Sequence, residues 1–282
     1  MKVRRLSAGL MAAALFTPGL AACTAADDGP AGSSASPTTA APATAPTSGG
    51  PVDGSAEQAL LDSTREISNG NFRFTMSALG STTEGQVHEP SQSAEITVRI
   101  GEPGDDLAMN LDLIHTRSDS WVKVDLGGAA AGSVPGLDKL NLGKYQHLDQ
   151  SRIKGDRNLG FDFDKVDPAG SDVLIQGITE ARRTGDGTYA GTLDLSKAAE
   201  AGSLDPATIT ALGGQAQAVP FTAELDPQGR LSELVLEIPA AGQVAAQQIR
   251  MTYSDYGNAT AARKPPADQV VEAPPELYSL VD

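Results

Sequence analysis

The chain contains a single cysteine, Cys23, among its 282 residues. This excludes disulfide bonds within the chain, CxxC redox pairs and thiolate metal sites. The three histidines, His88, His115 and His147, lie far apart in polar segments without a spacing typical of a metal site, so we expect them at the surface. The sequence therefore predicts neither a disulfide-stabilised fold nor a metal centre, and no cofactor.

Aromatic and basic residues are also scarce. Six Phe, five Tyr and one Trp leave few large side chains to fill an interior. Lys and Arg number 21 against 36 acidic residues, for a net charge of −15. A chain this acidic is a poor nucleic-acid binder and is repelled by anionic lipid head groups. Any membrane attachment must therefore be hydrophobic.

No uncharged run at the N-terminus is long enough to span a bilayer, but Leu6–Leu20 follows a basic start, MKVRR. This pattern predicts a secretory signal peptide over residues 1–22. The segment LAAC, Leu20–Cys23, fits the bacterial lipobox, so we expect cleavage before Cys23 and a diacylglycerol on its thiol. The alternative, an incidental buried cysteine, has no core to sit in at this position. Cys23 is therefore predicted to anchor the protein to the extracytoplasmic face of the cell membrane.

Residues 23–54 are expected to form the lipidated cysteine and a disordered tether. The tract from 24 to 54 consists of Ala, Ser, Thr, Pro, Gly and three Asp, with Val52 as its only large aliphatic residue. Such a composition cannot bury enough apolar surface to offset the entropy of ordering. Residues 55–282 contain no second linker and no repeat, and we predict a single domain there.

Alternation of apolar and polar residues dominates this domain and predicts half-buried strands. Gly185–Gly187 and Asp226–Gly229 mark hairpin turns, so the strands should form an antiparallel sheet with one apolar face. A large sheet of this kind curls, and few helices are available to cover it, so we predict an α+β fold with an apolar cavity. The residues predicted to line the cavity are Phe72, Phe74, Met76, Met109, Leu111, Leu113, Val122, Val124, Phe221, Leu234, Leu236 and Ile238.

Helix signals are few. Ser55 and Gln58 form a capping box, and Gly70 lies where a helix should end. Asp205 and Asp167, each followed by proline, predict two further helix starts.

Four segments resemble, in order and spacing, the LppX/LprG family of actinobacterial lipoproteins: ALLDSTREISNGNFRFTM, WVKVDLG, GKYQHLDQSRI and MTYSDYGNATAARKPPAD. The resemblance implies a LolA-like half-barrel, an antiparallel sheet wrapped around a few helices. It also implies a cavity that binds acyl chains of lipids or lipoglycans and carries them outward from the cytoplasmic membrane. It leaves open which lipid is bound and whether a membrane lipid exporter is a partner.

The chain departs from this family in the Gly/Ala-rich stretch at 127–136. Two interpretations remain open for it, a solvated connecting loop or a flexible lid beside the cavity.

Catalytic patterns are weak. The SxxK spacing occurs at Ser120/Lys123 and Ser151/Lys154, but no SDN, KTG or GxSxG motif accompanies it. The first pair lies in an alternating strand, which places Ser and Lys on opposite faces. We therefore predict a non-enzymatic lipid carrier. The alternatives are a tethered structural or regulatory module with a filled core and, less favoured, a cell-envelope hydrolase.

Overall fold

The computed structural model describes residues 54–78, 80–101, 104–129, 139–156, 158–196, 206–242 and 244–281. The predicted signal peptide, Cys23 and nearly all of the tether lie outside the described residues, as do residues 130–136 of the Gly/Ala-rich stretch. The described residues belong to one compact unit, Gly49–Asp282.

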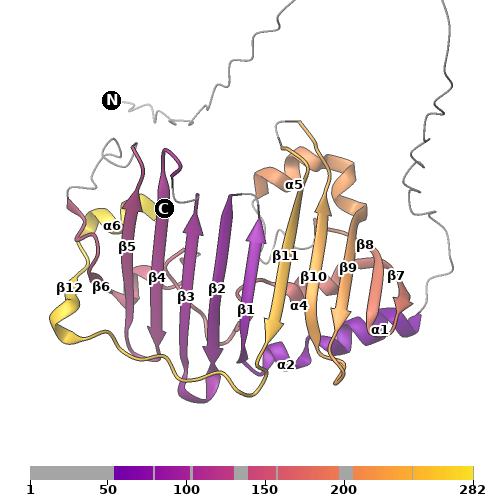
Figure 1. Cartoon of the computed structure of the whole chain (residues 1–282), viewed down its shortest axis with the longest axis horizontal. Helices are drawn as coiled ribbons and strands as arrows, with labels where there is room; N and C mark the ends of the chain where they lie inside the picture. The colour runs from indigo at the N-terminus through magenta and orange to yellow at the C-terminus, as the bar shows by residue number, and fades with distance from the viewer. Residues whose placement is uncertain are drawn as a thin grey trace, which may run out of the picture. The chain divides into compact units, whose positions relative to one another are not determined.

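A single twelve-stranded sheet forms the frame of the protein (Figure 1). Its strands are β1 (Asn71–Ala78), β2 (Ser81–His88), β3 (Ser93–Ile100), β4 (Ala108–Thr116), β5 (Ser120–Gly127), β6 (Tyr145–Leu148), β7 (Ile178–Gly185), β8 (Thr188–Leu193), β9 (Val219–Leu225), β10 (Leu231–Ile238), β11 (Gln247–Ser254) and β12 (Val270–Glu272). Two antiparallel meanders, β1–β6 and β7–β11, join through the antiparallel pair β1–β11. The short β12 adds to β6 in parallel. The predicted large, curved antiparallel sheet with few helices is confirmed, and the sheet does not close on itself.

The helices are short. They are α1 (Gly54–Ser63), α2 (Arg65–Ser68), α3 (Gln150–Ile153), α4 (Ser171–Gln176), α5 (Pro206–Leu212) and α6 (Pro275–Val281), with 3₁₀ turns η1 (Glu89–Ser91), η4 (Gly213–Ala218) and η5 (Ala267–Gln269). The single helix expected from Ser55 to Gly70 is divided at Thr64. Ser63 and Thr64 donate side-chain hydrogen bonds to the carbonyls of Leu60 and Leu61, an arrangement that bends helices.

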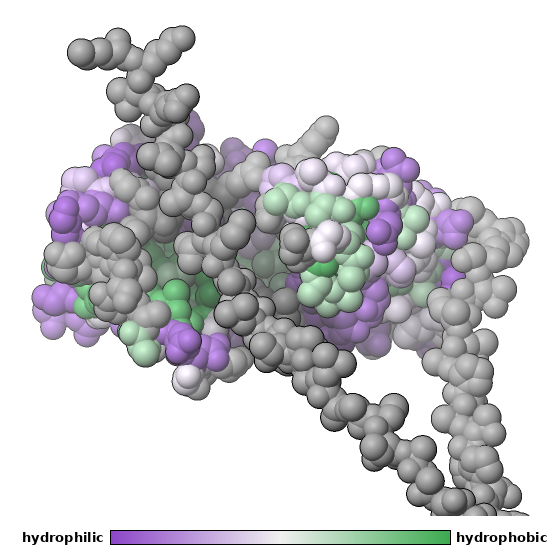
Figure 2. All heavy atoms as spheres, turned by 90° about the horizontal axis from the view of Figure 1, so that it is seen from above, coloured by the Kyte–Doolittle hydropathy of each residue, from purple (hydrophilic) through white to green (hydrophobic). Residues whose placement is uncertain are grey.

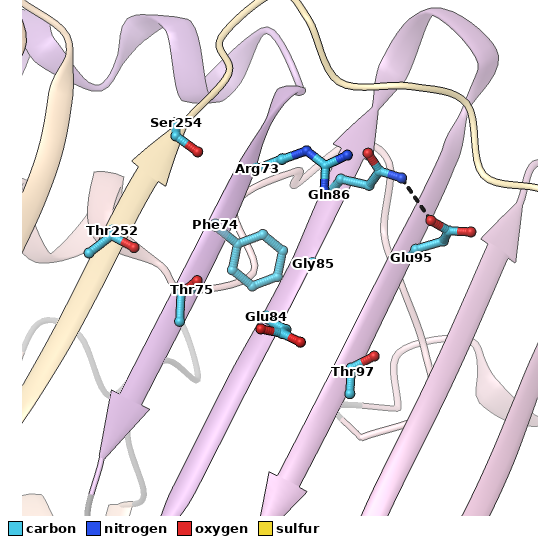
Figure 3. Close-up of a pocket in the computed structure, with 10 residues that line it drawn as sticks. All are labelled: Arg73, Phe74, Thr75, Glu84, Gly85, Gln86, Glu95, Thr97, Thr252 and Ser254. Carbon is cyan, nitrogen blue, oxygen red and sulfur yellow. Dashed lines mark hydrogen bonds between the residues drawn. The ribbon is translucent and has the colours of Figure 1, made fainter.

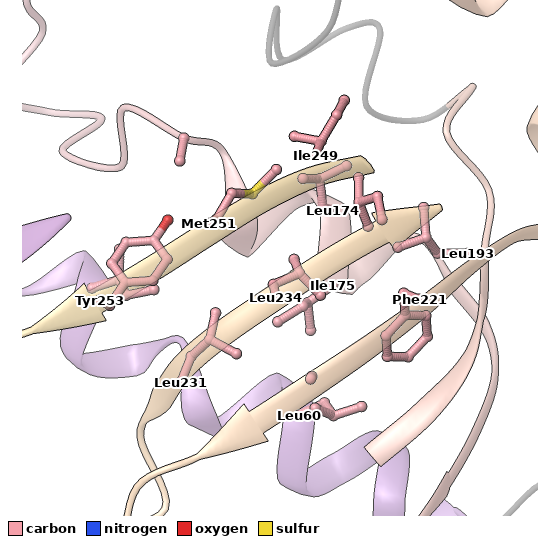
Figure 4. Close-up of a cluster of buried hydrophobic side chains, with 14 of the residues drawn as sticks. Leu60, Leu174, Ile175, Leu193, Phe221, Leu231, Leu234, Ile249, Met251 and Tyr253 are labelled. Atoms are coloured by element: carbon pink, nitrogen blue, oxygen red, sulfur yellow. The ribbon is translucent and has the colours of Figure 1, made fainter. Parts of the chain in front are cut away.

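Two clusters of buried apolar side chains fill the inner face of the sheet. The first cluster lies mainly over β7–β11 and β1, where Leu60 of α1 and Leu174 of α4 pack on strand residues such as Phe221 and Leu234 (Figure 4). The second cluster lies over β4–β6 and comprises Leu111, Leu113, Val122, Val124, Leu140, Leu148, Ile153, Leu159, Leu277 and Tyr278.

The C-terminal segment runs past the ends of the first meander before it reaches the second cluster. From β11, residues 255–269 pass β1, where Ala259 N–H bonds to the Asn71 side chain, and reach the β4–β5 turn, where Lys264 pairs with Asp119 at 2.8 Å. This strap is the yellow trace along the lower edge of the sheet in Figure 1. It ends in β12 and α6, which brings Leu277 into the second cluster.

A phenylalanine faces a glycine at one place in each meander. Phe74 pairs with Gly85, and Phe221 pairs with Gly191. A Cβ atom on either glycine would lie 3.0 Å from the ring and would overlap a carbonyl oxygen of the next strand. Each ring thus occupies the space that the glycine leaves on the inner face.

Candidate functional site

Apolar side chains cross the inner face of β3, β4 and β5 in register. We call them the apolar rows; from the end of β3 inward they are Ile100–Met109–Leu126, Val98–Leu111–Val124 and Ile96–Leu113–Val122. They arise because alternation along each strand puts every second residue on this face, and antiparallel pairing aligns those residues between strands.

Burial increases from the first apolar row to the third. Ile100 is 42% exposed and Met109 is half-buried, whereas Leu111 is 9% exposed and Val122 is fully buried. Seen from the end at which β3 finishes, apolar side chains lie in a hollow on the β3–β5 side of the molecule (Figure 2). Among the described residues, the inner face of the first meander is therefore more exposed at the end where β3 finishes, which we call the open end, than at the other end.

Exposed apolar side chains gather at the open end. Among the described residues, the large hydrophobic side chains that are exposed are Ile100, Leu107 and Leu142, at 42, 44 and 41%. Ile100 ends β3, Leu107 immediately precedes β4, and Leu142 adjoins Gly143, whose N–H bonds to the Val124 carbonyl of β5. We call these three residues the apolar rim.

The twelve predicted cavity residues all lie in or against the two clusters, with the alternation expected. Met76 and Met109 are half-buried and the others are buried. Five of the predicted residues lie in the apolar rows and in or against the second cluster: Met109, Leu111, Leu113, Val122 and Val124. Phe72, Phe74, Phe221, Leu234, Leu236 and Ile238 belong to the first cluster, which helices cover, and each is at most 3% exposed. Met76 packs against the first cluster. The structure thus divides the predicted set into two groups, and contact of either group with a ligand stays a prediction.

Gln146, which the sequence reasoning missed, extends the third apolar row onto β6, opposite Val122. It is fully buried, and neither its Nε2 nor its Oε1 has a hydrogen-bond partner among the described residues. Leaving a buried polar group unpaired costs about 1–3 kcal/mol. The signal was present in the segment YQHL, where Gln146 alternates with Leu148 and must share its face.

His115 is buried, at 2% exposed, which corrects the prediction of a surface histidine. It follows Leu111 and Leu113 at the same spacing, so its ring turns inward and stacks on Phe161 at 5.6 Å. Its Nδ1 lies 2.9 Å from Ser120 Oγ, and burial lowers its pKa to about 4. The ring is therefore neutral near pH 7, and its Nδ1 can accept a hydrogen bond from the Ser120 hydroxyl.

The same hydrogen bonds give Ser120 a structural role. Gln150 Nε2 donates to Ser120 Oγ at 2.8 Å, and the serine is 3% exposed, so a substrate has no access to it. Lys123 lies on the opposite face, as predicted, and pairs with Asp112 at 3.0 Å. Ser151 bonds to Asp149 at the start of α3. Neither SxxK spacing assembles a serine–lysine pair.

A polar depression of about 320 Å³ lies on the outer face (Figure 3). It is lined by Arg73, Phe74, Thr75, Glu84, Gly85, Gln86, Glu95, Thr97, Thr252 and Ser254. Its charged groups are already engaged: Gln86 bonds to Glu95 at 2.7 Å, and Arg99 pairs with Glu84 at 2.7 Å. This site offers hydroxyl and carboxylate groups rather than an apolar surface.

Two further properties bear on function. Within the described ranges, no three His, Cys, Asp or Glu side chains come together as metal ligands would. None of the helices described between Gly54 and Val281 has the length and apolarity of a membrane span.

No protein-family model and no curated protein sequence matches this chain. The resemblance to the LppX/LprG lipoproteins therefore rests on the four quoted segments alone.

Proposed function

We propose that this protein is a membrane-anchored carrier that binds acyl chains of lipids or lipoglycans and moves them outward from the cytoplasmic membrane. The observation that carries the proposal is the decrease in exposure from the first apolar row to the third, from 42% at Ile100 to full burial at Val122. An acyl chain needs a dry apolar surface that is open at one end, and this gradient of exposure supports such a surface on β3–β5.

Affinity in such a site comes from burial of the chain. Each buried CH₂ contributes about 0.8 kcal/mol, so a long chain binds without directed hydrogen bonds. Met109 at the open end suits this work, because an unbranched thioether adapts to chains of different shape. No covalent step is part of the function.

The N-terminal segment would hold the carrier at the extracytoplasmic face of the membrane. A diacylglycerol on Cys23 would anchor it, and a flexible tract of residues 24–54 would reach about 30 Å from the bilayer. The apolar rim would then contact the membrane from which a lipid is drawn, or a membrane lipid exporter that delivers it. The resemblance of the four quoted segments to the LppX/LprG family, which implies a LolA-like half-barrel, supports this proposal.

A second candidate is a tethered structural module with a filled core. The first cluster favours it, because Phe221, Leu234 and Leu236 are at most 2% exposed beneath the helices. This candidate leaves the apolar rim and the half-buried Met109 without a role.

Substitution by tryptophan separates the two candidates. We expect Met109→Trp to fill the open end of the rows and to lower affinity for a fluorescent acyl probe at least tenfold, with little loss of stability. Leu236→Trp is the matched control in the filled cluster, where overpacking should cost about 1–3 kcal/mol and leave probe affinity unchanged.

The readouts are thermal unfolding of the delipidated protein and titration with the probe, supported by mass spectrometry of co-purifying lipids. A wild-type protein that never binds the probe, or a Met109→Trp variant that binds as well as wild type, would contradict the carrier.

A further inference from the structure

Gln146 is a polar side chain at the buried end of an apolar surface. It continues the third apolar row, Ile96–Leu113–Val122, across to β6. It is fully buried, and both of its amide atoms lack a hydrogen-bond partner in the described part of the chain. A leucine would fit this row without an unpaired polar group, so the amide calls for a partner.

A water molecule alone satisfies this position poorly. A buried water needs two to four polar partners. The residues paired directly with Gln146 are Val122 and Val271, and the next residue on its face is Leu148, all apolar. The polar residue diagonal to it, Ser120, is already engaged by His115 and Gln150. A partner that arrives attached to an apolar chain avoids this difficulty, because the chain is held by the rows and only one oxygen needs the amide.

We infer that Gln146 recognises a hydroxyl group on the acyl chain of the bound lipid. A glutamine amide presents N–H donors and a carbonyl acceptor side by side, and a hydroxyl group can accept from the former and donate to the latter. The row of Leu126 and the row of Val122 are four residues apart on β5, so the hydroxyl would lie about 13 Å from the open end. This inference rests on the proposed function and specifies its ligand as a hydroxylated acyl chain.

Access to Gln146 requires the chain to separate the apolar rows from the side chains of the second cluster that face them. Leu277 and Tyr278 belong to α6, a helix of seven residues attached through a three-residue strand. Displacing α6 would break the hydrogen bond from the Asp149 N–H to Tyr278 Oη at 2.9 Å and the Lys139–Glu276 ion pair at 3.0 Å, but no pairing between the long strands of the sheet.

The test compares stearic acid with its monohydroxylated derivatives, the hydroxyl placed at successive positions, in competition with a fluorescent acyl probe. We expect wild type to bind one position about tenfold more tightly than stearic acid, and Gln146→Leu to lose that preference while its affinity for stearic acid is kept. Gln146→Leu should also melt at a higher temperature, because an unpaired buried amide is removed. Gln146→Met is the second variant if Gln146→Leu does not fold.

Gln86→Leu is the matched control, since this buried amide lies on the outer face and already has Glu95 and Thr260 as partners. Its preference among the acids should equal that of wild type. Equal affinity of wild type for all the acids, or a preference that survives in Gln146→Leu, overturns the inference but leaves the carrier intact. Failure of every acid to bind contradicts both.

Discussion

Single residues show where alternation is a sufficient guide and where it is not. Alternation correctly places Phe74 and Leu111 on the inner face, and the same rule applied to His115 and Gln146 would have placed them there too. Polarity overrode it, because histidine and glutamine are usually exposed. The partner of His115 is Ser120 on the next strand, which Gln150 of α3 also holds, so the sequence alone cannot identify this contact. Gln146 has no partner among the described residues.

Asp167 is the residue through which pH should act on stability. Burial raises its pKa to about 6, although it accepts hydrogen bonds from Tyr253 Oη at 2.7 Å and from the Asp172 N–H at 3.0 Å. The folded state therefore binds more protons than the unfolded state between about pH 4 and pH 6. Its contribution to the free energy of unfolding should fall as pH rises through this window, by at most about 3 kcal/mol.

Asp167→Asn isolates this effect from the other carboxylates. Urea titrations at pH 4, 5, 6 and 7 give the free energy of unfolding of both proteins. The wild-type value should fall relative to that of the variant as pH rises. A difference that is constant over this range would show that Asp167 has an ordinary pKa.

At the scale of elements, the strands with strong alternation match the predicted ones closely, and the missed strands β2, β6 and β12 are those in which apolar alternation is weak or too short to recognise. β2, with the sequence STTEGQVH, offers Ser81, Thr83 and Gly85 to the inner face, with Val87 as the one large apolar side chain there, so its apolar pattern is weak. It is a strand because β1 and β3 both pair with it along its length. β12 is set by the strap that leads to it, which no local pattern reveals.

The apolar rim is the element through which lipid exchange should be measurable. We expect Ile100→Ser with Leu107→Ser to slow transfer of a fluorescent lipid between vesicles about tenfold, because an exposed apolar edge is lost. Both side chains are more than 40% exposed, so stability should change by less than about 0.5 kcal/mol.

Thr75→Ser with Thr252→Ser removes two methyl groups from the outer face and serves as the control for the rim. Transfer at the wild-type rate in the rim variant would exclude the rim from lipid exchange, and a slowed control would mean that the effect is not local.

At the scale of the whole molecule, the helix at each end of the described chain packs on the meander that is farther from it in sequence. α1, at the start of the described chain, packs against β7 and fills the cluster of the second meander with Leu60. α6, at its end, fills the cluster of the first meander with Leu277. The pairing of β1 with β11 joins residues about as far apart in sequence as the domain allows. Periodicity predicts the strands but carries no information about these long-range contacts.

This arrangement predicts that both halves unfold together. Leu60→Ala and Leu277→Ala should each lower the free energy of unfolding by about 2–5 kcal/mol, because both leucines are at most 2% exposed. Trp121, the single tryptophan, lies on β5 in the first meander and reports on that half. The urea midpoint of unfolding, followed by Trp121 fluorescence, should fall in both variants. This includes Leu60→Ala, whose substitution lies in the other half.

Leu142→Ala, at an exposed leucine, is the control for truncation as such and should leave the midpoint unchanged. A Trp121 midpoint that responds to Leu277→Ala and not to Leu60→Ala would show two independent halves.

The placement of α6 also fixes when the first meander can be finished during synthesis. Strands β1–β6 leave the ribosome, and any export channel, more than a hundred residues before Leu277 and Tyr278. Until that last segment arrives, the nascent chain presents an apolar sheet face that Ile153 and Leu159 cover only in part, and an unpaired β6 edge, both of which favour aggregation. A chaperone that holds the emerging chain would therefore matter most in the interval between β6 and the C-terminus, and premature termination there would leave a product that cannot bury its own strands.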